Sequence, residues 1–506
     1  LEYHFKHALT QEAAYASILP DKCKALHLKV AHTIENVFAE KLHAFYGMLA
    51  YHYSRGENLE KAEDALIKAG AEALKTSASS EALHYYLEAL NLYRRKSGQT
   101  ADSAKVALLE KNIAVAFHNR GQYEEALEYF DNSLEFYWGK FPKHPVSIFF
   151  HMTYGFLHLL VALYLPFMKF KKEPTAEDCE AIELFYTKCQ TLIIIYPRRF
   201  FFESLYFYRR FTQFDFTRFP NGAGKFISAS ALFTFTGISF GLGRRILALA
   251  QGRLNRQDER QMITYDLLQS TLKYFAGDWP GIERHDDDLV NRNLDIGEIW
   301  SASLHYYWHG FHNLYQGDIA VTQWLVKRLN DIAEVYENDA TLLFKQLLNT
   351  CLLMESRLLP EALDEIDRGV ALAKKTNSGL SLIHLYGCRA QIHLLMEDRK
   401  AAAADLEKAD VIRCSQEIVP WMVSVFCRSR AALALNRLQA AITDGHDADL
   451  PRMRRQAHKC CRALLRQTRK VAQHRTEALC MMGVYCWLIR KRRPALNWWQ
   501  KSIRVG

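Results

Sequence analysis

Residues 112–137 read NIAVAFHNRGQYEEALEYFDNSLEFY. Small residues stand at Ala114 and Ala126, and Gly121 lies between them. Two helices can approach each other closely only where their side chains are short. The stretch therefore predicts a helical hairpin whose helices cross at the two alanines and whose turn contains the glycine.

The same spacing recurs along most of the chain. Small residues begin the copies at Gly70, Ala114, Thr234, Ser270, Gly310, Thr350, Ala390, Ser429 and Gly483. Seven positions later a break or polar turn is predicted, at Ser77, Gly121, Gly241, Gly277, Gly317, Arg357, Glu397, Asn436 and Arg490. Twelve positions after each start the residue is usually small or β-branched, at Ala82, Ala126, Ile246, Ile282, Thr322, Ala362, Ala402, Ala441 and Ala495. From Thr234 the starts are separated by 36, 40, 40, 40, 39 and 54 residues, which is typical of a helical-hairpin array.

These copies resemble tetratricopeptide repeats, most clearly at residues 107–137, 350–369 and 483–502. The resemblance covers most of residues 60–506, although the period is longer than the family's period of about 34 residues. It implies an all-α fold, a right-handed α-solenoid of about eight to ten tetratricopeptide-like hairpins.

The composition agrees with a helical, reduced protein. Hydrophobic residues make up 49% of the 506 residues, and only 24 Gly and 12 Pro are present, which favours long helices. The eleven cysteines form no C-x-x-C pair and follow no apolar signal segment, so we expect free thiols and a cytoplasmic location. The sequence begins with Leu1 rather than Met, and we expect it to be part of a longer protein.

Residues 3–35 contain two amphipathic helical stretches on either side of Pro20. Their pattern resembles the segment that closes the ATPase module of STAND-type signalling proteins, in the matching residues Phe5, His7, Ala8, Leu9, Gln11, Glu12, Tyr15, Leu26, His27, Val30, Ala31, Ile34 and Glu35. Such bacterial ATPases often follow a class III nucleotide cyclase or a protein kinase and precede tetratricopeptide-like repeats. The resemblance implies that an upstream part bound ATP and that His7 senses nucleotide, whereas the alternative is that His7 only packs.

We expect five parts along the chain. They are the helical end of a truncated STAND-type ATPase module (1–41), the first repeats (42–138), irregular aromatic-rich repeats (139–250), repeats of about 40 residues (251–441) and a basic C-terminal repeat (442–506). Asn58 and Asp102 are predicted to cap helix N-termini.

Residues 146–168 contain no Asp, Glu, Lys or Arg over 23 residues, which is long enough to cross a bilayer. The weakly polar residues Ser147, His151, Tyr154, Gly155 and His158 share one helical face, and lysines flank both ends without a positive-inside bias. We favour a buried solenoid helix with one outward edge over membrane contact.

No catalytic motif is complete. The run NGAGKF at residues 221–226 lacks the first Gly and the final Ser or Thr of a phosphate-binding loop. His305, His309 and His312 share a helical face, but no Cys or carboxylate lies close to them in sequence, so we predict packed histidines and no metal. The acidic run ERHDDD at residues 283–288 is typical of a helix start. We expect no enzyme activity and no cofactor in this chain, although the intact protein would be an ATPase if the resemblance holds.

The C-terminal part is strongly basic. Residues 451–506 hold fifteen Lys and Arg against the single acid Glu477, a net charge of +14. One helical stripe contains Arg452, Arg455, Lys459, Arg462, Arg466 and Arg469. Met453, Ala457, Cys460, Leu464 and Val471 fall on the opposite side, which predicts a helix docked by one face. A solvated face fits this stripe best, an acidic protein partner or the ATPase half of the same chain comes next, and nucleic acid or anionic lipid comes last. Nucleic acid is disfavoured because no aromatic residues interleave with the bases.

The resemblance to tetratricopeptide arrays also implies a curved inner wall that binds a protein or peptide partner. Candidate wall residues are Lys111, His118, Thr271, Tyr274, Tyr307, Phe311, His384 and Gln391. We therefore predict a non-catalytic sensor or scaffold that regulates a cyclase- or kinase-linked STAND ATPase. The alternatives are a purely structural assembly segment of such an enzyme and a basic adaptor for membrane surfaces or nucleic acid.

Overall fold

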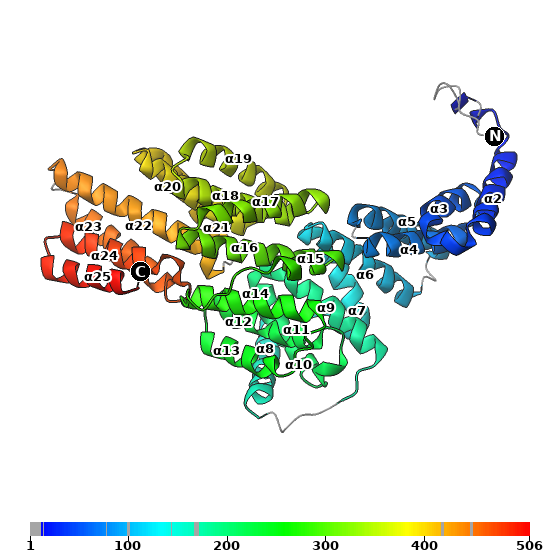
Figure 1. The fold of residues 1–506 in the computed structure, drawn as a ribbon, viewed down its shortest axis with the longest axis horizontal. Coiled ribbons are helices and arrows are strands. Elements are labelled where there is room, and N and C mark those ends of the chain that lie inside the picture. The colour runs from blue at the N-terminus through cyan, green and yellow to red at the C-terminus, as the bar shows by residue number, and fades with distance from the viewer. Residues whose placement is uncertain are drawn as a thin grey trace. The chain divides into compact units, whose positions relative to one another are not determined.

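The computed structural model describes residues 12–13, 15–76, 78–98, 102–142, 144–165, 172–415, 419–445 and 449–505. These residues form helices and no strand, apart from an isolated bridge between Lys172 and Phe214. The prediction of an all-α fold built from helical hairpins is confirmed (Figure 1). The chain divides into two compact units, residues 1–119 with 128–139, and residues 120–127 with 140–506. The five predicted parts stay a prediction.

The first unit is a short run of antiparallel helices. It contains α2 (Pro20–Val37), the 3-10 helix η1 (Ala39–Phe45), α3 (Tyr46–Arg55), α4 (Leu59–Lys75), α5 (Ser79–Ser97), α6 (Ser103–Asn119) and the second half of α7 (Tyr123–Trp138). Asn58 caps α4 as predicted, because its side chain accepts a hydrogen bond from the Lys61 backbone N–H. At the predicted crossing point Gly70, an added Cβ would lie 2.8 Å from the Tyr86 ring. Short side chains therefore set the spacing of α4 and α5.

The second unit begins with shorter and more irregular helices. They are α8 (Pro145–Tyr164), α9 (Ala176–Ile195), α10 (Pro197–Phe211), η3 (Phe216–Arg218), α11 (Gly222–Ile227), α12 (Ala229–Thr236) and α13 (Phe240–Gln251). The NGAGKF run opens α11, where Lys225 is buried with its amino group 2.5 Å from a carboxylate oxygen of Glu183. This lysine neutralises a carboxylate within the protein, in agreement with the rejection of a phosphate loop.

Regular hairpins follow up to the C-terminus. Their helices are α14 (Glu259–Ala276), α15 (Asp287–Asp295), α16 (Ile299–Gln316), α17 (Ile319–Val335), α18 (Asp339–Glu355), α19 (Leu359–Lys375), α20 (Gly379–Leu395), α21 (Arg399–Ser415), α22 (Pro420–Thr443), α23 (Leu450–Gln467), η4 (Ala472–His474), α24 (Arg475–Leu488) and α25 (Arg492–Val505). Each predicted crossing residue from Gly310 to Gly483 lies in the first helix of a pair.

The predicted turn positions are confirmed where the repeat is regular. Six of them adopt left-handed backbone conformations with φ between 62° and 88°, namely Gly121, Gly277, Gly317, Arg357, Glu397 and Arg490. A residue in this conformation ends a helix and lets the chain reverse. The seven-residue spacing from crossing point to turn is thus a property of the folded hairpin.

The spacing predicts three features wrongly. The break predicted at Gly241 occurs at Gly237, and Gly241 lies inside α13. Ile282 lies in the non-helical connection before α15, which inserts residues into the repeat. Asn436 is no turn, because α22 continues through it for 24 residues where the preceding helices have 17. Asn is tolerated inside a helix, so the residue alone does not stop one.

The first helices of the hairpins are buried on more sides than the second. Thirteen residues of α16 and eleven each of α18 and α20 are buried, whereas α17 and α19 bury six each along one face. The additional cover comes from the start of α22 and from residues 468–477, which we call the closing segment. Within it, Gln473 donates a hydrogen bond to the Tyr315 hydroxyl (2.8 Å), and Arg475 donates one to the Ala276 carbonyl (3.4 Å). The inner wall of this part of the array is therefore occupied by the chain itself.

Candidate functional site

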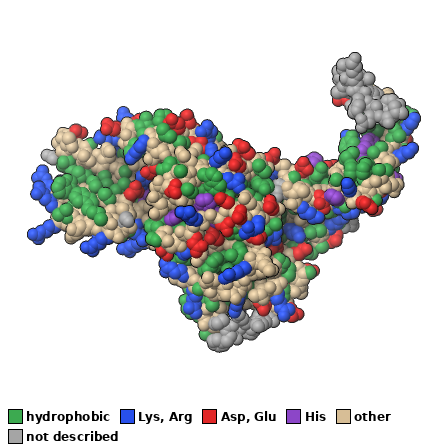
Figure 2. Space-filling model, viewed as in Figure 1, with side chains coloured by type: hydrophobic (Ala, Val, Ile, Leu, Met, Phe, Trp, Pro, Cys, Tyr) green, Lys and Arg blue, Asp and Glu red, His purple; other side chains and the backbone are tan. Residues whose placement is uncertain are grey.

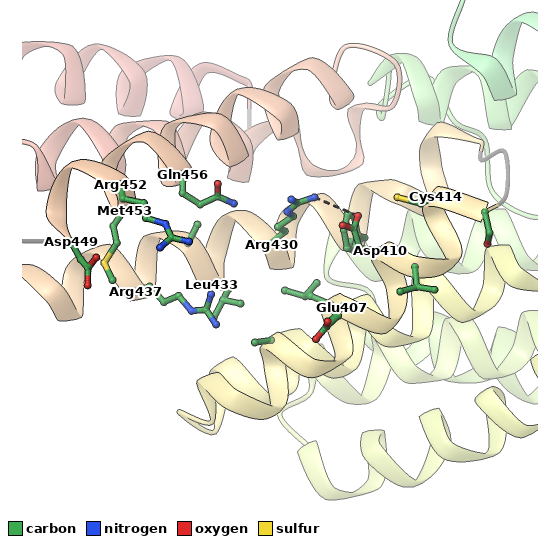
Figure 3. Close-up of a pocket in the computed structure, with 16 residues that line it drawn as sticks. Glu407, Asp410, Cys414, Arg430, Leu433, Arg437, Asp449, Arg452, Met453 and Gln456 are labelled. Carbon is green, nitrogen blue, oxygen red and sulfur yellow. Dashed lines mark ion pairs between the residues drawn. The ribbon is translucent and has the colours of Figure 1, made fainter.

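An open groove lies over α22, between α21 and α23. Its volume is about 1030 Å³. The floor is apolar and buried, and is formed by Leu406, Phe426, Leu433 and Ala434. Figure 3 shows Glu407 and Asp410 on one side of the groove, Arg430 and Arg437 on α22, and Asp449, Arg452 and Met453 at one end. An apolar floor with charged edges is the form of a site for an amphipathic helix.

The length of α22 explains why the groove exists. Its seven additional residues lengthen the helix by about 10 Å relative to the 17-residue helices before it. Along this length α22 packs closely against α20 and much less against α21. Because α21 does not pack against α22 along its whole length, the apolar side of α22 stays open between α21 and α23.

Charges are distributed unequally around the groove. The acids Glu407 and Asp410 lie on α21, whereas the bases Arg430, Arg437 and Arg452 lie on α22 and α23. Arg430 reaches Asp410 at 3.6 Å, as the dashed line in Figure 3 marks. Among the described residues neither Arg437 nor Arg452 forms an ion pair, and both are exposed. These two guanidinium groups are thus available to an acidic ligand.

The predicted basic stripe lies along α23 and, at Arg469, just beyond its C-terminal end. All six bases are exposed, namely Arg452, Arg455, Lys459, Arg462, Arg466 and Arg469. Ala457, Cys460 and Leu464 are buried on the opposite side, as predicted. Figure 2 shows Lys and Arg side chains gathered around the end of the molecule that holds α23 to α25. Of the six bases, only Arg452 lines the groove.

The predicted inner-wall residues are mostly buried. His118, Thr271, Tyr274, Tyr307, Phe311 and His384 are each at most 4% exposed, while Lys111 and Gln391 are half-buried. Trp421 at the start of α22 lies against this wall, with ring centres 5.8 Å from Tyr307, 5.9 Å from Phe311 and 5.3 Å from His384. In this structure these side chains form core instead of an open surface. Their predicted contact with a peptide stays a prediction.

Tertiary structure brings a carboxylate to two of the three predicted histidines. Asp266 on α14 lies 3.0 Å from Nδ1 of His305 and 3.6 Å from Nε2 of His309, while His312 lies outside this group. Burial alone would raise the pKa of Asp266, but the two imidazoles outweigh it and hold that pKa below its usual range. The sequence analysis did not identify Asp266 as a neighbour of these histidines, because it lies 39 residues from His305 in the sequence.

One hydrogen bond at this cluster bears on the tautomer of His305 and disfavours a metal at its Nδ1. The Asp286 backbone N–H donates to Nε2 of His305 (3.4 Å), which leaves the ring proton of neutral His305 on Nδ1, facing Asp266. A metal at Nδ1 would have to displace that proton and the Asp286 bond together. The absence of a metal here stays a prediction.

A second buried group contains Cys351, His384 and Cys388. The Cys351 sulfur lies 3.6 Å from Nε2 of His384 and 3.9 Å from the Cys388 sulfur. Hydrogen bonding with Cys388, together with burial, raises the pKa of Cys351 well above its usual range. These ligand types suit zinc, but a structural zinc site takes four ligands and the group supplies three among the described residues.

Two further predictions concern helix ends and the nucleotide. The acidic run starts a helix as predicted, because the Asp286 side chain accepts a hydrogen bond from the Leu289 backbone N–H and caps α15. His7, the predicted nucleotide sensor, lies outside the described residues.

The prediction that the apolar segment is a buried helix is wrong. Of α8, only Gly155, Leu159 and Leu163 are buried. The helix is the one element of the described residues with the length and composition to cross a membrane. Most of the weakly polar face that we predicted to point outward instead packs inward, because Gly155 allows close approach to the α10 backbone and His151 contacts Arg209 at 2.9 Å, whereas Tyr154 at its edge is exposed.

Comparison with known proteins leaves the family open. No protein-family model matches the chain, and no curated protein matches it. Among solved structures, yeast Tom70 is similar at a TM-score of 0.32 and 11% sequence identity, covering 96% of this chain and 93% of that one. The APC/C hetero-tetramer Cut9-Hcn1 is similar at the same TM-score and identity, covering 96% of this chain and 91% of that one. The helical-hairpin architecture rests on the helices of this chain.

Proposed function

We propose that the chain is a non-catalytic interaction scaffold whose groove between α21 and α23 binds an amphipathic helix of a partner protein. The observation that carries this proposal is the apolar floor of the groove, which is bounded by exposed and unequally charged rims. Leu406, Phe426 and Leu433 would contact the apolar stripe of the partner helix. Acidic side chains beside that stripe would face Arg437 and Arg452.

The test is a selection of helical ligands on the full chain. A display library of amphipathic sequences, with Leu at helical spacing and Glu or Lys on the flanks, would be selected for binding. We expect enrichment of sequences with Glu on one flank, since the bases of α22 and α23 define that edge. Affinity would then be measured for the chain and for groove variants.

Two groove variants and two matched controls distinguish binding in the groove from nonspecific binding. Val411→Glu changes a groove residue that is 66% exposed, and Arg437→Glu with Arg452→Glu reverses the basic rim. We expect each to weaken binding at least about tenfold, or about 1.4 kcal/mol. Val335→Glu on α17 and Arg462→Glu with Arg466→Glu on the outer face of α23 should leave binding unchanged. Equal loss in variants and controls, or in neither, would refute the groove as the binding site.

We further propose, from the resemblance of residues 3–35 to the end of a STAND-type ATPase module, that this scaffold regulates such an ATPase in the longer protein. A ligand could do so only by binding one state of the ATPase better than the other. The measurement is ATPase activity of the full-length protein and of a form without the array, each with and without a selected peptide. Equal activity in all four samples would contradict this proposal without affecting the groove.

A further inference from the structure

A row of apolar side chains runs along the outer face of α8. Seven residues, each at least 38% exposed, make up the row, namely Val146, Phe149, Phe150, Tyr154, Leu157, Val161 and Tyr164. Their spacing of three or four positions, with Phe149 and Phe150 adjacent, places them on one side of the helix. The row spans about 27 Å at the rise of an α-helix. Such a row is far more apolar than scattered surface residues require.

Contacts with α10 and α13 fix α8 to the rest of the second unit, on the opposite face at Gly155 and His151 and beside the row at Tyr154 and Tyr164. A Cβ at Gly155 would lie 2.2 Å from the carbonyl oxygen of Leu205 on α10, so the two backbones nearly touch. Arg209 contacts His151 and lies over the Tyr154 ring at 4.5 Å. Arg245 of α13 lies over the Tyr164 ring at 4.1 Å and donates a hydrogen bond to the Leu163 carbonyl. The helix is therefore a ridge on a folded surface.

This attachment is incompatible with a membrane-spanning helix. A span would carry the guanidinium groups of Arg209 and Arg245, along with α10, into hydrocarbon. Charged side chains at that depth are costly, and a helix packed on one side by a polar domain cannot be surrounded by lipid. A helix of this kind can instead lie in the plane of the membrane surface with one face inserted.

The charges around α8 indicate which surface fits. Residues 139–172 contain five lysines and no acid, at Lys140, Lys143, Lys169, Lys171 and Lys172. Lys140 and Lys172, the two that the structure describes, are exposed. A symmetric contact with a second copy would bring two such basic segments together, which is unfavourable. An anionic lipid surface attracts lysines and accepts the apolar row at the same time.

We propose that α8 is an interfacial anchor that lays its apolar row on an anionic phospholipid surface, with the exposed Lys140 and Lys172 at the headgroups. The aromatic residues Phe149, Phe150, Tyr154 and Tyr164 would lie at the boundary between headgroups and acyl chains, where such rings are favoured. This role concerns a different surface from the α21–α23 groove and does not depend on it.

The test is flotation of the full chain with vesicles of phosphatidylcholine and of an equal mixture of phosphatidylcholine and phosphatidylglycerol. We expect binding to the anionic vesicles that is at least about tenfold stronger than to the neutral ones and that weakens between about 0.1 M and about 1 M salt. Phe149→Asp with Phe150→Asp should reduce it at least about tenfold. Val335→Asp with Ile503→Asp, at apolar residues that are 73% and 79% exposed elsewhere, is the matched control and should bind like the unchanged chain.

The variants and the remaining outcomes keep the proposal open to refutation. Circular dichroism checks that the variants stay folded, and Lys140→Glu with Lys172→Glu tests the charges without altering the apolar row. No binding to either vesicle, or equal binding by both aspartate variants, would overturn the proposal. Bound protein that alkaline carbonate cannot release would overturn it in favour of a span. Self-association that the Phe149 and Phe150 changes abolish, without vesicle binding, would overturn it in favour of a protein interface.

Discussion

Replacement of Glu477 by Gln is expected to loosen the closing segment. Glu477 begins α24 and forms ion pairs with Arg428 of α22 at 3.1 Å and with His474 of η4 at 3.0 Å. Arg428 and His474 are buried, so loss of the carboxylate leaves a buried cation without its main partner. Among the described residues, the ion-pair partner left to Arg428 would be Glu355, whose carboxylate lies 3.9 Å away.

The expected loss of stability follows from the pKa shift of the Glu477 carboxyl group. Burial alone would raise the pKa of Glu477, but Arg428 and then His474 outweigh it and lower that pKa from 4.5 to about 2. A fully buried group with this shift would contribute about 3 kcal/mol to stability at neutral pH. Because the Glu477 side chain is 42% exposed, solvent screening reduces the expected contribution to about 1–2 kcal/mol.

Hydrogen exchange detected by mass spectrometry measures this local opening. At neutral pH, amides of residues 468–477 and of the helices that they cover should exchange about five to thirty times faster in Glu477→Gln than in the unchanged chain. A lowered pKa stabilises the fold above about pH 4.5, and that stability is lost as the pH falls towards about 2. The difference in amide exchange rate between Glu477→Gln and the unchanged chain should therefore become smaller as the pH falls through this interval.

The matched control is Glu407→Gln, which neutralises an exposed glutamate on α21 outside the closing segment. Its exchange in residues 468–477 should equal that of the unchanged chain. Equal exchange in Glu477→Gln and the control at neutral pH would refute the role of the ion pairs. A difference that stays constant down to about pH 2 would show that it does not arise from ionisation of this carboxylate.

Three further predictions concern the hairpins and the buried clusters. Gly310→Ala should lower stability by about 1–3 kcal/mol in chemical denaturation, because the new Cβ would lie 2.3 Å from Leu348 Cδ2, and an unchanged midpoint would contradict the close crossing. Arg357→Gly should raise the free energy of unfolding by up to about 1 kcal/mol, because glycine adopts the left-handed backbone of this turn without strain. Gly317→Ala should lower the free energy of unfolding by a similar amount, although there is open space around the new Cβ. Stability changes of the same sign in the two variants would refute this explanation. Addition of zinc or of a chelator should leave the thermal midpoint unchanged, since Nε2 of His305 already accepts a hydrogen bond from the Asp286 backbone and the Cys351 group supplies three ligands among the described residues. One equivalent of zinc that is retained after dialysis and lost in Cys351→Ser would contradict this prediction.

The sequence predicts the features that local spacing determines. The turns at Gly317, Arg357 and Glu397 recur because hairpins with helices of 17 or 18 residues share one spacing from crossing point to turn. The basic face of α23 is equally local, since its amphipathic pattern lies within one helix.

Features that depend on distant residues could not be predicted in this way. The contact of Gln473 with Tyr315 joins residues 158 positions apart, so nothing near either residue indicates that the inner wall is covered. The groove has no motif, because it arises from the length of α22 and from its unequal packing on α20 and α21. For α8 the sequence shows which residues form the weakly polar face. Which way this face points depends on Gly155 and on the arginines of neighbouring helices, which the local pattern does not reveal.

The closing segment has a mechanical consequence. An open array of helical hairpins bends and stretches because small rotations between neighbouring hairpins add along its length. The bonds from Gln473 to Tyr315 and from Arg475 to Ala276 tie together parts of the array that are separated by 158 and 199 residues. Rotations between the successive hairpins from α14 to α24 therefore cannot add up while these bonds hold. We expect residues 259–488 to resist extension until the two hydrogen bonds break together.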